Sequence, residues 1–340
     1  LMLLVTHALS QISQVPEKGI TFDVSEAERK VDVFFDGLYF TSYIYPLNLE
    51  KPVLYPLSTA TGTIVTRGFP LASRPGERID HPHQVGWWFN YGDVNNLDFW
   101  NNSYAIADSL KPRYGSIRHN KVLKTEGGKS QGKLVVSCFW VDHPGQVLLE
   151  EVTTFVFTGD ESRRRITRET RLTAVAGDVR FGDNKEGLCA LRVDRAFESP
   201  SDKAEVFTDK SGLPSVVAVL NNDGVNGVYR SSAGKEKDEV WGTRAEWVSL
   251  SAKKNNEEIS ICLFDSPQNP GAPAYWHARG YGLFAANDLG HKAFDPSAPE
   301  NITLLRKGDT LVFNHMILIK TNGFITPEEL KTEANRFSNR

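Results

Sequence analysis

Short segments rich in β-branched and aromatic residues, separated by turn signals, recur along most of this 340-residue chain. Such segments are typical of β-strands. Asp36-Gly37 separates two of them, and Asp-Gly readily adopts the positive φ angles of a two-residue hairpin turn. The pattern predicts three hairpins, formed by residues 31–35 with 38–45, by 134–141 with 147–157, and by 302–306 with 310–320. The chain should therefore fold mainly into antiparallel strands.

A single helix is predicted, at the C-terminal end of the chain. Thr326 can cap it, Pro327 suits its first turn, and Glu329 completes a capping box with Thr326. No other helical pattern alternates with the strands, which disfavours a doubly wound α/β fold. The chain also has no Gly-rich dinucleotide fingerprint and no P-loop. The sequence therefore predicts an all-β protein, an antiparallel β-sandwich with a short C-terminal helix.

Composition excludes two classes of partner. Lys and Arg number 39 against 42 Asp and Glu, so the chain lacks the positive excess that binding a phosphate backbone requires, and nucleic acid is not an expected partner. No apolar run approaches the roughly 20 residues that cross a bilayer, so no transmembrane segment is expected. Cys138, Cys189 and Cys262 are far apart and are predicted to be buried small residues.

The first residues resemble the end of a signal peptide. Residues 1–5 are apolar, and Ala8-Leu9-Ser10 has the small-x-small pattern of a cleavage site. We therefore expect residues 1–18 to be a remnant of a signal peptide and linker, and residues 19–340 to form a single β-sandwich catalytic domain. The protein is predicted to be periplasmic or secreted. The alternative is an N-terminal strand that packs on the domain.

The densest cluster of unusual side chains lies at residues 80–100, where Asp80-His81-Pro82-His83 precedes three of the seven tryptophans of the chain. Pro82 disfavours helical geometry for His81, which predicts an extended segment whose two histidines project to the same side. Aromatic rings stack on sugars, and amides and acids bond their hydroxyl groups. The candidate substrate-binding residues here are Trp88, Asn90, Asp98 and Trp100. The alternative is a pair of surface histidines on a loop.

A second cluster lies at residues 275–284. In a strand, His277, Arg279 and Tyr281 would share one face, because alternate side chains point the same way. A histidine that transfers protons, a fixed cation and a phenol on one face form a candidate active site. The alternative is the ordinary polar face of an antiparallel sheet.

Two further stretches supply charged and aromatic residues. In residues 180–187, Glu186 is a candidate base opposite a histidine acid, and Lys185 is expected to point away from it. A solvated salt bridge is the alternative. In residues 239–247, the combination of Trp241, Arg244 and Glu246 is typical of a sugar subsite, unless the tryptophan belongs to the core.

These four motifs, together with Gly92–Trp100, resemble those of the PmoA-like family, which is often labelled methane oxygenase. The resemblance covers residues 45–320. The label fails a physical test, because a membrane methane monooxygenase subunit needs several transmembrane helices. The resemblance implies the galactose mutarotase-like β-supersandwich, which sugar epimerases, lyases and hydrolases use, and it implies a role in glycan degradation.

The combined prediction is an exported carbohydrate-active enzyme of the lyase, hydrolase or epimerase type, with an oligosaccharide or a smaller sugar as substrate. In this prediction a proton is donated and oriented by the histidines His81, His83 and His277. Glu186 removes a proton, and Arg279 stabilises the negative charge that develops. Lys185 and Tyr281 are further substrate-binding candidates. No cofactor is predicted, although a divalent metal ion could join the site. One alternative is a mononuclear non-haem metal oxygenase with His81, His83 and Asp98 or Glu186 as ligands. Another is a non-catalytic glycan-binding protein.

Overall fold

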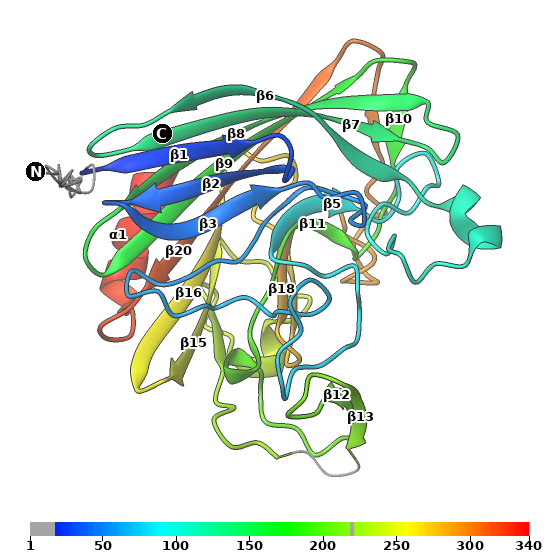
Figure 1. Ribbon diagram of the computed structural model, residues 1–340. Helices are drawn as coiled ribbons and strands as arrows, with labels where there is room; N and C mark the ends of the chain where they lie inside the picture. Colours follow the sequence, from blue (N-terminus) through cyan, green and yellow to red (C-terminus); the bar gives the residue numbers. More distant parts are fainter. Residues whose placement is uncertain (1–17, 218–220, 340) are drawn as a thin grey trace, which may run out of the picture.

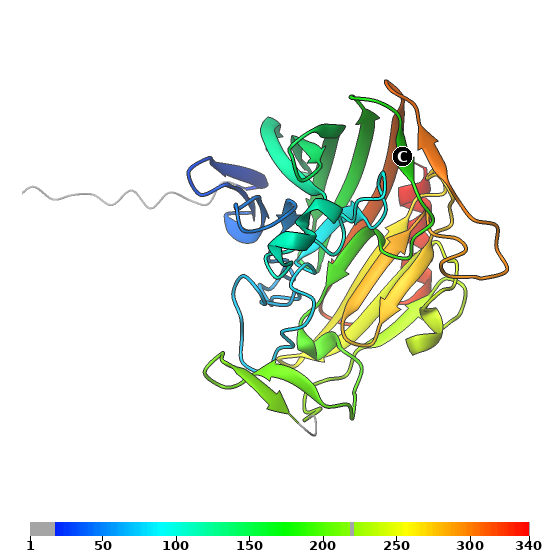
Figure 2. The ribbon, with the colours of Figure 1, turned by 90° about the vertical axis from the view of Figure 1, so that its right-hand side faces the viewer.

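The computed structural model describes residues 18–217 and 221–339, and its main feature is a pair of eight-stranded antiparallel sheets (Figures 1 and 2). The first sheet has the spatial order β1 (Ile20–Ser25), β2 (Lys30–Phe35), β3 (Leu38–Ile44), β4 (Val53–Leu54), β5 (Trp87–Tyr91), β11 (Gly187–Arg192), β18 (Leu283–Asn287) and β17 (Tyr275–Arg279). The second has the order β14 (Val228–Ser231), β15 (Trp247–Lys254), β16 (Glu257–Asp265), β20 (Thr310–Lys320), β9 (Arg163–Ala174), β8 (Val147–Gly159), β7 (Gly132–Val141) and β6 (Ser116–Glu126).

Smaller elements lie at the margins of the sheets. Strand β10 (Val179–Phe181) pairs with β19 (Thr303–Leu305), and β12 (Glu205–Thr208) pairs with β13 (Pro214–Val217). Three short 3₁₀ helices, η1 (Asp108–Arg113), η2 (Arg195–Phe197) and η3 (Lys237–Val240), belong to the connections.

The main hydrophobic core lies between the two sheets. In β5, Trp87 and Phe89 face the second sheet, where their rings lie 6.4 Å from Phe155 of β8 and 5.5 Å from Phe313 of β20. Because strand side chains alternate, Trp88 and Asn90 face the opposite way. The outer face of the first sheet is therefore available for a site.

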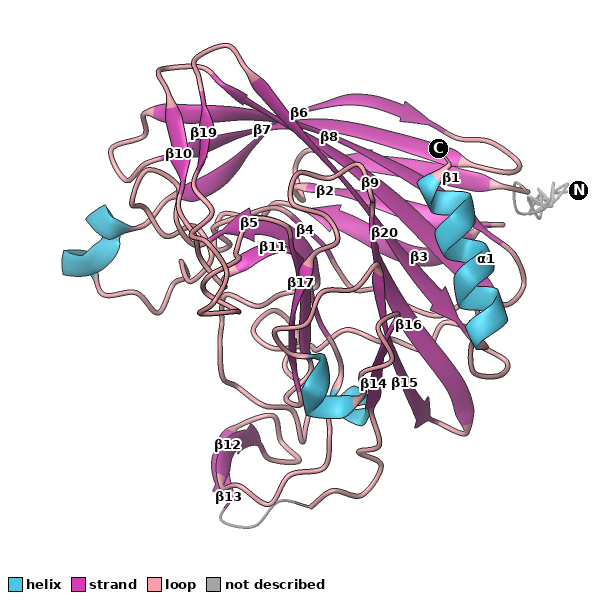
Figure 3. Cartoon of the chain, turned by 180° about the vertical axis from the view of Figure 1, so that it is seen from behind, coloured by secondary structure: helices cyan, strands magenta, loops and turns pink. Residues whose placement is uncertain are grey.

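The outer face of the second sheet carries the helix α1 (Pro327–Ser338), which packs Leu330 and Phe337 against residues of β16 and β20 (Figure 3). The predicted capping box is present: Thr326 accepts a hydrogen bond from the backbone of Glu329, and the Glu329 side chain accepts one from the backbone of Thr326. The all-β fold with a short C-terminal helix is confirmed. Cys138, Cys189 and Cys262 are buried and unbridged, as predicted.

Two of the three predicted hairpins are confirmed, and the third is wrong. β2 pairs with β3, and β7 pairs with β8. The third hairpin is wrong, because β19 pairs with β10, whereas β20 lies between β16 and β9 in the second sheet. The turn between β19 and β20 joins strands that diverge, since each finds its hydrogen-bonding partners elsewhere in the chain.

The predicted signal-peptide remnant, residues 1–18, lies outside the described residues except for Lys18. Among the helices of the described part of the chain, none is long and apolar enough to cross a membrane.

Candidate active site

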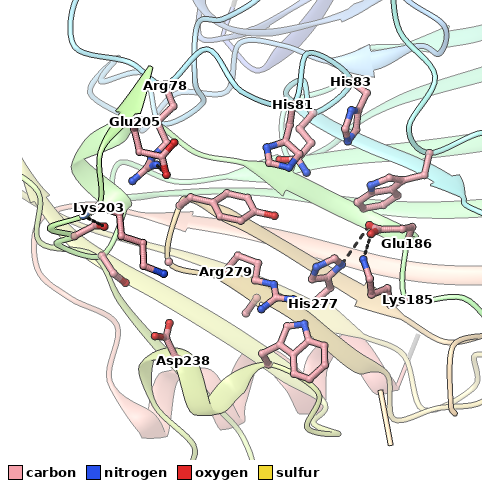
Figure 4. Close-up of a pocket in the computed structure, with 18 of the residues that line it drawn as sticks. Arg78, His81, His83, Lys185, Glu186, Lys203, Glu205, Asp238, His277 and Arg279 are labelled. Carbon is pink, nitrogen blue, oxygen red and sulfur yellow. Dashed lines mark hydrogen bonds and ion pairs between the residues drawn. The ribbon is translucent and has the colours of Figure 1, made fainter. Parts of the chain in front are cut away.

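A cavity of about 680 Å³ opens on the outer side of the first sheet. It lies at the edge strand β17, where Trp276 and Ala278 face the main core, so His277 and Arg279 point the other way. The turn before β5, the loop before β11, residues 199–205 and the segment of η3 and Trp241 supply the other sides. In Figure 4, His81 and His83 lie along one side of the cavity, and His277 and Arg279 lie along the other.

The structure brings together nine of the predicted site residues. All five predicted catalytic residues line the cavity, namely His81, His83, Glu186, His277 and Arg279. Four predicted substrate-binding residues do so as well, namely Trp100, Lys185, Trp241 and Tyr281. The segments that carry them are distant in sequence and meet only through the fold.

The two histidines of the first motif are held by a turn, which corrects the prediction of an extended segment. The backbone N–H of Gln84 donates to the carbonyl of His81 over 3.0 Å, with Pro82 at the second position of the turn, where its fixed φ is favourable. His81 has a φ of 44°. The two rings nevertheless lie 5.6 Å apart and both reach the cavity.

His81 forms a hydrogen-bonded pair with Asp80. Its Nδ1 lies 2.6 Å from Oδ2 of Asp80, and its ring stacks on Tyr281 with 5.1 Å between the centroids. The other Asp80 oxygen accepts from Arg67 and from Arg192 over 2.7 and 2.6 Å. Although burial opposes ionisation, the bond from His81 and the charges of Arg192 and Arg67 hold the pKa of Asp80 well below its ordinary value. The ionised carboxylate therefore fixes the proton on Nδ1 and leaves Nε2 free to exchange a proton with a ligand.

Glu186 stands between a lysine and a histidine. The prediction that Lys185 points away from Glu186 is wrong, because Lys185 donates to Oε1 of Glu186 (Figure 4). Nδ1 of His277 lies 3.5 Å from Oε2 of the same carboxylate. The loop that carries Glu186 is held close to Gly92, whose N–H donates to the Glu186 carbonyl over 2.7 Å. A Cβ atom at Gly92 would approach the Cβ of Glu186 to 2.8 Å, so only glycine fits there.

His277 is a neutral imidazole at neutral pH. Burial, and then the positive charges of Lys185 and Arg279, lower its pKa from 6.5 to about 3. Its Nδ1 has no hydrogen-bond partner among the described residues, because the approach to Glu186 lacks hydrogen-bond geometry. His277 is therefore suited to orienting a ligand or Glu186, and less suited to the part of cationic acid.

Arg279 extends over the indole ring of Trp241, with its guanidinium carbon 4.8 Å from the ring centroid. Two other cations of the cavity are paired, whereas Lys203, an exposed residue of the lining, makes no ion pair in the described part of the chain. Lys185 pairs with Glu186, and Arg78 bonds Glu198 and Glu205 at 2.7 and 2.8 Å. Within residues 18–217 and 221–339, Arg279 makes no ion pair.

A buried lysine that sequence reasoning missed supports the histidine turn. Lys51 donates to the carbonyl of His83 over 2.6 Å and lies 5.3 Å from the ring centroid of Trp88. Burial lowers the pKa of Lys51 to about 7 and that of His83 to about 2. No local pattern could identify Lys51 or the arginines Arg67 and Arg192, because each meets the turn only through tertiary contacts.

Five predicted substrate-binding residues do not line the cavity. The ring of Trp88 packs against that of Trp100, with 5.3 Å between the centroids, and its Nε1 donates to Oδ1 of Asn90 over 2.9 Å. Asp98 accepts from the backbone of Trp100 and Asn101, so it shapes the loop. Arg244 and Glu246 are exposed, and Arg244 donates to the carbonyls of Gly271 and Pro273. The backbone of Glu246 bonds Ser232 and Asp265, which holds this segment beside β14 and β16 rather than in the lining of the cavity.

One group of side chains in the described part of the chain could hold a metal ion, and it lies outside the cavity. Ligand atoms of Asp265, Asp288 and His315 lie within 4.8 Å of one another. Burial raises the pKa of Asp265 well above its ordinary value and that of Asp288 to about 7, which favours protonated carboxyl groups. The predicted metal triad of His81, His83 and Asp98 or Glu186 is not among the described groups whose ligand atoms lie within 4.8 Å of one another.

Solved structures give distant similarities. A galactose mutarotase-like protein from Clostridium acetobutylicum is 9% identical, with 88% of this chain and 98% of that chain covered and a TM-score of 0.41. The galactosidase domain of an α-galactosidase-sucrose kinase is 10% identical, with 89% and 42% covered and a TM-score of 0.35. A galactose mutarotase related enzyme from Lactobacillus acidophilus is 8% identical, with 89% and 98% covered and a TM-score of 0.28.

Sequence comparisons place the chain in a family and correct one prediction. No curated protein matches the sequence. The resemblance to the PmoA-like family is wrong, because the family model that matches, over residues 30–335, is a different one. The chain belongs to a family of unknown function, DUF6807.

Proposed function

We propose that this protein is an enzyme that acts on a carbohydrate by general acid and base catalysis. One observation carries the proposal. Three titratable groups from distant segments, His81, Glu186 and His277, line a single cavity that also contains tryptophan rings and charged side chains. Aromatic rings beside charged groups suit the apolar faces and the hydroxyl groups of a sugar.

The proposed proton-transfer pair is His81 and Glu186. Asp80 bonds Nδ1 of His81 and stabilises its imidazolium form, which gives a proton from Nε2, whereas the Glu186 carboxylate takes a proton. The Glu186 carboxylate is positioned by Lys185 and His277 on a different segment. Elimination, hydrolysis and epimerisation of sugars each need one group that takes a proton and one that gives a proton.

Two variants test the pair. A glycan library screened for products with the wild-type protein supplies the substrate. His81→Ala and Glu186→Gln should then each lower turnover about 10²- to 10⁴-fold, the usual contribution of a positioned acid or base. The affinity for the sugar and the thermal unfolding temperature should remain close to those of the wild type.

The control is His143→Ala, an exposed histidine on the turn between β7 and β8, which should leave turnover unchanged. Full turnover in both site variants would refute the proposed function. Sugar binding without turnover by the wild type would favour a glycan-binding protein. Activity that is lost on chelation and restored by ferrous iron and oxygen would favour an oxygenase.

A further inference from the structure

Arg279 is a half-buried cation of the cavity that lacks a counter-ion among the described residues, and the other unpaired cation of the lining, Lys203, is exposed to solvent. It lies on β17 two residues after His277, half-buried and packed over Trp241. Lys185 and Arg78 are each matched by carboxylates, whereas Arg279 pairs with none in the described part of the chain. A cation that is partly removed from water is stabilised only when an anion or strong acceptors replace the lost hydration.

The same cavity presents hydrogen-bond donors without acceptors. The indole Nε1 atoms of Trp100 and Trp241 are buried and bond no group within residues 18–217 and 221–339. Trp100 is fully buried, and an indole N–H can only donate. The remaining acids of the lining, Asp202 and Asp238, are exposed residues. Two of the tryptophans that line the cavity therefore carry buried indole N–H donors without a partner in the described part of the chain.

We infer that the substrate is an acidic carbohydrate, whose carboxylate is bound by Arg279. This inference rests on the proposed function and adds the substrate class to it. The planar guanidinium fork matches the two oxygens of a carboxylate, and a rigid aromatic support reduces the freedom lost on binding. Trp241 is that support, with its ring centroid 4.8 Å from the guanidinium carbon of Arg279.

Matched pairs of ligands provide the test. Each uronate-containing oligosaccharide of a panel is compared with its carboxyl-reduced, neutral counterpart. Dissociation constants are measured by calorimetry on the His81→Ala variant, which should consume the ligand about 10²- to 10⁴-fold more slowly and keeps the Lys185–Glu186 pair. The acidic member of the pair that binds should bind about 10- to 100-fold more tightly, as expected for hydrogen bonds to a charged group. Arg279→Met should remove this preference and leave the affinity for the neutral member unchanged.

Arg244→Met serves as the matched control, because Arg244 is an exposed arginine outside the cavity. It should retain the full preference. Equal binding of acidic and neutral members, equal weakening of both by Arg279→Met, or binding of sulfated sugars alone would refute the acidic-substrate inference while leaving the proposed function intact. Absence of binding to every carbohydrate would instead refute the proposed function. Circular dichroism of each variant separates loss of binding from loss of folding.

Discussion

The outer faces of the two sheets both carry arginine residues, but they differ in whether every arginine is paired with a carboxylate. On the second sheet, Arg163 and Arg165 of β9 meet Glu329 and Glu333 of α1, and Nε of Arg165 lies 2.8 Å from Glu333. The helix thus neutralises the charged face that it covers. On the first sheet, Arg279 has no such partner among the described residues.

This difference separates a structural network from a site. Charged residues on a strand face do not by themselves indicate function, because a covering element can pair all of them. A face is a candidate site when it retains buried or partly buried donors that the described residues do not satisfy, as at Trp100, Trp241 and Arg279.

The largest expected effect on stability comes from breaking the paired face. In Glu333→Gln, the nearly buried Arg165 loses its bidentate carboxylate partner, so the free energy of unfolding should fall by about 3 kcal/mol. Urea unfolding measures this change. Turnover per folded molecule should not change, because α1 lies on the outer face of the second sheet.

The control is Glu258→Gln, which removes an exposed pair with Lys253 and should cost at most about 1 kcal/mol. If Glu333→Gln instead unfolds as the wild type does, the helix face is not a stabilising network. If it also lowers turnover, the two faces are coupled and the distinction between them fails.

A smaller effect should appear on the site face at acid pH. The pKa of His277 is about 3 in the folded state and near 6.5 when unfolded, so the unfolded chain alone takes up a proton as the pH falls below 6.5. Stability present at neutral pH is therefore lost between about pH 6.5 and 3. At pH 5 this histidine should account for about 2 kcal/mol of the loss.

His277→Gln should reduce the loss in unfolding free energy between pH 7 and pH 5 by that amount, as measured by urea unfolding at both values. His143→Gln, on an exposed turn, is the matched control. An identical loss in the wild type and in His277→Gln would show that His277 does not remain neutral in the folded protein.

Most of the fold could be predicted, because strand periodicity and turn chemistry are local properties. Asp36-Gly37 alone is enough to indicate the β2–β3 hairpin. The error at β19 arose because sequence adjacency favours hairpins, whereas the hydrogen-bonding partner of β19 is β10, more than 100 residues earlier. Pairing between distant strands has no local signal.

The site was predictable to the extent that it uses unusual residue combinations. The motifs around His81, Glu186, Trp241 and His277 meet in one cavity. The supporting residues Arg67 and Arg192 could not be found, since they reach Asp80 from different segments. Trp88 was misplaced because strand alternation gives the direction of a side chain but not what covers it.

The smallest expected effects concern two residues that sequence reasoning assigned to the sugar subsite. Arg244 bonds only backbone carbonyls outside the cavity, and Glu246 is exposed. Arg244→Ala and Glu246→Ala should each leave kcat/KM within about twofold of the wild type, which corresponds to the roughly 0.5 kcal/mol typical of surface substitutions. Steady-state kinetics on the substrate found by screening measures this. A tenfold fall in either variant would extend the site beyond Trp241 to this surface, and unpaired donors would then no longer mark where the site ends.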